Sequence, residues 1–181
     1  MQVLLNLGLI VLSLWKLYLD ICRFRLGPQD VPSSPALMRL LMLVYFIVGV
    51  VLSKLHFELF AAIARTLIDL SVMVILTLFL LWWRGHLGRA VQTISAMAGT
   101  GIVVSLIASP VLLALDFVGQ DSPIAMIPAI IWFGIFCWSI GVGGHILRHA
   151  LNVNLIAGVM FSVAYVLITL DILSRIFQTV S

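Results

Sequence analysis

Two pairs of oppositely charged residues lie inside long apolar stretches of this sequence, and they are its first candidates for chemistry. Arg65 and Asp69 stand four residues apart, and Asp171 and Arg175 repeat that spacing. Ionisable side chains at membrane depth are costly to desolvate, so they mark candidate functional sites, and a cluster of all four could bind an ion or an anionic group. Because residues four apart meet on one helical face, we favour pairing within each helix.

A second candidate cluster places two imidazoles four residues apart on one helical face. It consists of His145, Arg148 and His149. Such spacing suits zinc, but a usable site needs at least a third ligand, and the HExxH pattern is not present in the sequence. We therefore predict no metal, and we interpret these side chains as residues that snorkel to the cytoplasmic surface.

Patterns typical of enzymes are missing from the sequence. It contains no nucleophile elbow and no glycine-rich phosphate loop, and Cys22 and Cys137 lack the spacing of a redox or zinc site. We predict no catalytic residue, no cofactor and no enzymatic activity. The few basic residues are spread over connections rather than clustered, which argues against nucleic acid as a partner.

The elements that carry these residues are predicted from hydropathy. Hydrophobic residues make up 63% of the chain and charged residues only 9%, whereas a soluble domain is about 25% charged. The lipid bilayer is therefore the first expected partner. A membrane-crossing helix needs about 20 apolar residues. We predict an all-α polytopic transmembrane bundle in residues 37–181, with five spans at about 37–55, 60–83, 91–117, 124–147 and 154–176.

Two further segments precede the predicted spans. Residues 27–36 form a proline-rich linker, in which Ser34 followed by Pro35 is typical of a helix start. Residues 1–26 form an amphipathic helix, because the few polar side chains of its first 20 residues project into one narrow sector. We favour a helix that lies in the cytoplasmic interface. The alternative is a sixth span whose polar seam faces the bundle.

The basic residues predict an orientation. If the chain enters the first span from the cytoplasm, seven of the ten Lys and Arg residues lie on that side. Positive charge is retained on the cytoplasmic side of membrane proteins. We therefore expect an integral protein of a bacterial inner membrane, with the N-terminus in the cytoplasm and the C-terminus on the opposite side.

Small residues recur at about four-residue steps in the third and fourth predicted spans. Such residues let helix backbones approach closely, which is how helices associate in lipid. We expect them to serve packing within the bundle. The residues are Gly99, Gly101, Ser105, Ser109, Gly141 and Gly144.

Two stretches resemble bacterial proteins grouped with the Yip family. They are the run from Gly88 to Gly101 that leads on to Pro110, and Trp138-Ser139 followed by the run from Gly144 to Leu151. The resemblance implies five spans with a cytosolic N-terminus. Eukaryotic members are similar to trafficking factors that engage Rab-type GTPases through a long, acidic-motif-bearing N-terminal region. That motif has no match here, so GTPase binding does not carry over.

These observations favour a non-enzymatic membrane protein that acts through helix–helix contact, as a scaffold, assembly factor or membrane-organising subunit. Its partners would be other membrane proteins or a second copy of itself. The alternative is a small transporter or channel-like carrier, with a polar path near Arg65, Asp69 and Asp171. A cavity that reaches these residues would favour transport, and dry packing would favour the scaffold.

Overall fold

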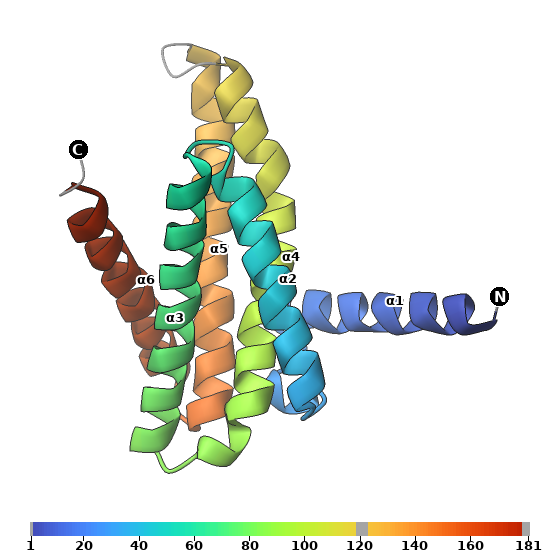
Figure 1. The fold of residues 1–181 in the computed structure, drawn as a ribbon. Helices are drawn as coiled ribbons and strands as arrows, with labels where there is room; N and C mark the ends of the chain where they lie inside the picture. Colours follow the sequence, from blue (N-terminus) through green and yellow to red (C-terminus); the bar gives the residue numbers. More distant parts are fainter. Residues whose placement is uncertain (1, 119–122, 179–181) are drawn as a thin grey trace.

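The computed structural model describes residues 2–118 and 123–178, and every regular element within them is helical. Six α-helices and three short 3₁₀ turns follow one another along the chain (Figure 1). The predicted all-α class is therefore confirmed. The α-helices are α1 Gln2–Cys22, α2 Pro35–Ser53, α3 Leu59–Trp83, α4 Ala90–Val118, α5 Met126–Leu151 and α6 Leu155–Gln178, and the turns are η1 Pro28–Asp30, η2 Leu87–Arg89 and η3 Pro123–Ala125.

Helices α2 to α6 are long and apolar enough to cross a membrane. They correspond to the five stretches of high hydropathy, with ends that differ by a few residues. The largest difference is at the end of α5, which continues through Arg148 to Leu151. It ends only where Asn152 adopts φ +53° and the Val153 amide donates to the Arg148 carbonyl. Basic side chains are compatible with this last turn, because the helix dipole is negative there.

Polar side chains start two of the helices. The Ser34 hydroxyl accepts a hydrogen bond from the Leu37 amide at 3.3 Å, and Pro35 occupies the first position of α2. The Asn154 side chain accepts from the Ala157 amide at 2.8 Å at the start of α6. Both contacts satisfy amides that the first helical turn leaves without a backbone partner.

Helix α1 ends in a turn that redirects the chain into the bundle. Phe24 adopts φ +62°, the Arg25 amide donates to the Asp20 carbonyl, and the Phe24 amide donates to the Ile21 carbonyl. This pattern is a Schellman motif, in which glycine is the usual left-handed residue. A bulky residue is strained there, and the Phe24 ring packs edge-on against the His145 ring of α5.

Helices α2 to α5 stand upright side by side, α6 runs obliquely with its C-terminal end leaning away from them, and α1 runs crosswise to this bundle (Figure 1). Helix α4 lies at the centre of the packing, in contact with α1, α2, α3 and α5. We call the end with the α2–α3 connection the distal end, at the top of Figure 1, and the end with the α3–α4 and α5–α6 connections the proximal end.

Glycines allow the closest helix contacts. A Cβ at Gly99 of α4 would lie 2.4 Å from the Tyr18 ring of α1, and one at Gly101 would lie 2.5 Å from the Tyr45 ring of α2. A Cβ at Gly144 of α5 would lie 2.7 Å from the Val159 Cα of α6, which is backbone and cannot move aside. The small residues of α4 and α5 thus bring α1, α2 and α6 close to the centre.

Other members of the small-residue set make looser contacts. Gly141 faces the Phe24 ring, with a Cβ distance of 3.5 Å that an alanine would tolerate. Ser105 lines two cavities. The Ser109 hydroxyl bonds the Leu106 carbonyl of its own helix and is exposed, so we find it outside the packed contacts.

Candidate functional site

Asp69 connects three helices through hydrogen bonds. Its two carboxylate oxygens accept one bond each, from the Tyr45 hydroxyl of α2 and from the Tyr165 hydroxyl of α6. Hydrogen bonds with a charged acceptor are among the stronger ones. We call Tyr45, Asp69 and Tyr165 the carboxylate clamp, because they hold α2, α3 and α6 together.

Arg65 does not pair with Asp69 in the part of the chain that the structure describes. Its guanidinium carbon lies 4.0 Å from the centroid of the Phe57 ring and 4.7 Å from that of the Phe177 ring. Both are cation–π contacts. The expectation of an ion pair within this helix is therefore wrong for Arg65 and Asp69, because the carboxylate faces the tyrosines and the guanidinium faces aromatic rings.

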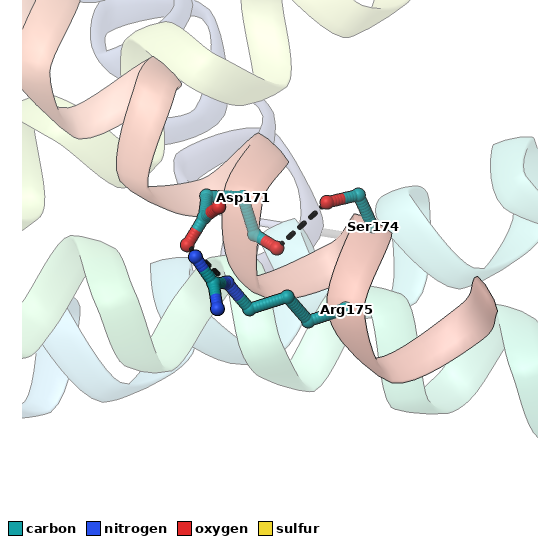
Figure 2. Close-up of polar contacts among 3 residues, drawn as sticks. All are labelled: Asp171, Ser174 and Arg175. Carbon is teal, nitrogen blue, oxygen red and sulfur yellow. Dashed lines mark hydrogen bonds and ion pairs between the residues drawn. The ribbon is translucent and has the colours of Figure 1, made fainter. Parts of the chain in front are cut away.

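Asp171 and Arg175 do pair within their own helix. The Arg175 Nε lies 2.8 Å from the Asp171 carboxylate, and the Ser174 hydroxyl donates to the Asp171 carbonyl at 2.9 Å (Figure 2). Their side chains are 57% and 77% exposed, so this pair lies on the outer surface of α6. The four charged residues thus do not form one cluster, and Asp171 is not among the residues that line a cavity with Asp69.

Two cavities adjoin the carboxylate clamp. The distal cavity, of about 280 Å³, is lined by Arg65, Thr66 and Asp69 of α3 and by side chains of α2, α4 and α6. The central cavity, of about 220 Å³, includes Tyr165 in its lining. Tyr45 and Ser105 line both cavities, so the two cavities meet at these side chains.

The clamp tyrosines are the residues that sequence reasoning missed. Tyr45 is 24 residues from Asp69, and Tyr165 is 96 residues from it. No spacing rule links residues so far apart. The available signal was that the chain has only three tyrosines, and that each polar ring inside an apolar helix needs a hydrogen-bond partner.

In the cluster of His145, Arg148 and His149 at the proximal end, the His145 side chain is packed inside the protein rather than exposed. His145 is 4% exposed, its Nε2 lies 2.9 Å from the Leu26 carbonyl, and its ring contacts those of Phe24 and His149. Since a carbonyl only accepts, Nε2 carries the proton. The prediction that His145 snorkels to the surface is wrong, because the segment after α1 folds over it.

His149 completes this cluster through contacts with His145 and Arg148. Arg148 Nε donates to His149 Nε2 at 3.3 Å, which leaves that nitrogen without a proton. Among the described residues, no group of three or more metal-binding side chains occurs.

Two arginines close the C-terminal end of α5. Arg89 donates to the carbonyls of His149 and Ala150, each at 3.1 Å, and Arg84 donates to the Leu151 carbonyl at 3.4 Å. These carbonyls have no partner within the helix, and the helix dipole places negative charge there. The sequence indicated only that these arginines lie on the cytoplasmic side; the structure gives them a capping contact.

The fold and its polar interior define a class of protein. Five apolar helices of spanning length, joined by a partly buried carboxylate and by glycine contacts, make this an integral membrane protein with a helical bundle. Comparison of the chain with protein families, with curated proteins and with solved structures finds no match.

Proposed function

We propose that this chain is a non-enzymatic, Yip-type protein of a bacterial inner membrane that acts through helix–helix contact, as a scaffold or membrane-organising subunit. The observation that carries the proposal is the placement of α1. This helix is about 30 Å long at 1.5 Å per residue. Of its side chains that the structure describes from Val11 onward, those packed in the core begin at Leu14. The packed residues are Leu14, Leu17, Tyr18, Leu19, Ile21 and Cys22.

Two apolar side chains that precede these packed residues in α1 are exposed. Val11 is 64% exposed and Leu12 is 65% exposed. Because α1 runs crosswise to the bundle in Figure 1, its direction supports a helix lying in the membrane plane rather than a sixth span. An in-plane arm with a free apolar face provides contact area for a neighbouring membrane helix.

The depth of the α1 attachment supports a role within the bilayer. Trp138 Nε1 of α5 donates to the Cys22 carbonyl at 3.0 Å. Trp138 precedes the last residue of α5 by 13 positions, about 20 Å of helix rise. The end of α1 is therefore attached well above the proximal end of the bundle, where it can meet other helices in lipid.

A photo-crosslinker in place of Leu12, used in native membranes, tests this proposal. The matched control is Ile131 of α5, another exposed apolar side chain on a helix of spanning length. We expect defined protein adducts from position 12, including adducts with a second copy, and lipid adducts alone from position 131. Lipid adducts alone from both positions, together with solute flux in liposomes, would overturn the proposal.

A small carrier is the second candidate, and the meeting of the two cavities at Tyr45 and Ser105 favours it. A path through the bundle would have to pass the carboxylate clamp. Tracer flux into liposomes that hold the purified protein, compared with protein-free liposomes, distinguishes the two candidates. The scaffold predicts no difference in flux between them.

A further inference from the structure

The distal cavity contains a carboxylate whose charge has no cationic partner among the described residues. Asp69 receives two tyrosine hydroxyls, and neither donor carries a charge. A carboxylate has about four lone-pair sites, so two remain after these bonds. An ionised group in a membrane-embedded bundle is costly unless it is compensated, which makes Asp69 a binding candidate rather than packing alone.

A second group in the same cavity also has no hydrogen-bond partner among the residues that the structure describes. Thr169 of α6 is 8% exposed and lines the distal cavity, and its hydroxyl oxygen is buried without a hydrogen bond. A buried polar atom left unsatisfied costs about 1–3 kcal/mol. Thr169 follows Tyr165 by four residues, which places both on one face of α6, next to the clamp.

From these two observations we propose that the distal cavity binds a small monovalent cation, with the Asp69 carboxylate and the Thr169 hydroxyl as ligands. Carboxylate, hydroxyl and water oxygens are the ligands that hard cations prefer. Asp69 is the one acidic residue in the cavity lining, which suits a single positive charge better than two. A volume of about 280 Å³ holds such an ion with several waters.

Arg65 competes with the cation in this arrangement. It lines the same cavity, and the rings of Phe57 and Phe177 hold its guanidinium. Its positive charge raises the free energy of a cation bound nearby. Removal of Arg65 therefore strengthens binding, whereas removal of Asp69 abolishes it. This inference does not rest on the scaffold proposal, because it concerns occupancy and not partners.

The test is thermal unfolding of the purified full chain in detergent. Sodium or potassium chloride replaces N-methyl-D-glucamine chloride at constant ionic strength. We expect a saturable rise in Tm of about 3 °C or more with a small cation, since a ligand that binds only the folded state stabilises it.

Four variants test which residues bind the cation. Asp69→Asn abolishes the cation-dependent rise, Thr169→Val raises the midpoint concentration at least tenfold, and Arg65→Gln lowers it. The control is Thr100→Val, outside the distal cavity, where the hydroxyl already donates to the Ala96 carbonyl at 2.7 Å. It leaves the midpoint unchanged.

Three outcomes would overturn the proposal. An equal response to all salts would show an ionic-strength effect, and a response to pH alone would make the site a proton site. An unchanged midpoint in both Thr169→Val and Arg65→Gln would contradict the ligand set, even if Asp69→Asn fails to fold.

Discussion

At the residue scale, the clearest contrast lies among the three tyrosines. The hydroxyls of Tyr45 and Tyr165 donate to Asp69, whereas the buried hydroxyl of Tyr18 has no partner within the described part of the chain. The same functional group thus holds helices together at two positions and carries only a desolvation cost at the third. Phenylalanine substitution removes the hydroxyl alone and separates these two cases.

We expect Tyr45→Phe and Tyr165→Phe each to lower the free energy of unfolding by about 1–2 kcal/mol, because each leaves Asp69 with one donor fewer. Tyr18→Phe is the control, and we expect it to be neutral or slightly stabilising. Unfolding in mixed micelles measures all three. Equal losses at all three positions would show that the clamp adds nothing beyond ring packing.

The environment of Cys22 leads to a prediction about pH. Its side chain is fully buried, and burial raises the pKa of the thiol to about 12. The thiolate is the form that attacks a maleimide, so the reactive fraction is very small at neutral pH and grows only as pH approaches that pKa.

In a Cys137→Ala background we expect Cys22 to react at least 100-fold more slowly with a maleimide than an exposed thiol at pH 7.5. Tyr18→Ala should accelerate the reaction, because it loosens the attachment of α1 and exposes Cys22. Fast labelling without that second change would mean that α1 leaves the bundle readily.

At the element scale, α1 is the helix whose placement matters most for function. An in-plane helix keeps all its residues at one depth, whereas a spanning helix changes depth by 1.5 Å per residue. Gly8 and Trp15 are seven residues apart and lie on nearly the same face of α1. Probes at these two positions therefore differ in membrane depth only if the helix is tilted out of the membrane plane.

A fluorophore at Gly8→Cys and one at Trp15→Cys should be quenched to the same depth by lipid-attached quenchers. A sixth span would instead separate the two depths by about 10 Å. The quenching profile in liposomes measures this difference directly. A clear separation of the two depths would contradict the in-plane placement and show that α1 is a sixth span.

The α5–α6 contact depends on the absence of a side chain. A Cβ at Gly144 would lie 2.7 Å from the Val159 Cα, while a Cβ at Gly134 of the same helix meets nothing within 4 Å. We expect Gly144→Ala to lower the free energy of unfolding by about 1–3 kcal/mol through overpacking. Gly134→Ala should be neutral or stabilising, because alanine is the better helix former. A similar effect at both sites would contradict the packing argument.

At the scale of the whole molecule, the arginines that cap α5 also place positive charge at the proximal end of the bundle. Arg84 and Arg89 contact the last carbonyls of α5, and Arg148 lies in its last turn. Basic residues near a membrane surface are retained on the cytoplasmic side. We therefore assign the proximal end to the cytoplasm as a prediction.

A membrane-impermeant maleimide tests this orientation in intact cells that express a cysteine-free chain with one added cysteine. Lys54→Cys, in the exposed α2–α3 connection, should be labelled from outside. Gly88→Cys, in the exposed α3–α4 connection, should be labelled only after lysis. The reverse pattern would invert the orientation and with it the assignment of the proximal end.

Much of the fold followed from the sequence because its causes are local. The length of each apolar stretch sets the length of a helix in lipid, where every backbone amide must bond internally. Helix starts such as Ser34-Pro35 and pairs such as Asp171 and Arg175 also depend on residues within four positions. For these features the chain's own sequence was enough.

Only the tertiary structure decided what happens to the polar residues inside the bundle. Arg65 and Asp69 have the spacing of Asp171 and Arg175, yet they do not pair, since α2, α6 and the segment before α3 offer them tyrosine and phenylalanine rings. Likewise His145 is buried because residues 24–26 cover it. The sequence by itself determined a five-helix membrane bundle, because hydropathy and helix length act locally. The hydrogen-bond partners of Asp69 and His145 lie 24 to 119 residues away along the chain, and Arg65 contacts Phe177 of another helix, which no local rule specifies.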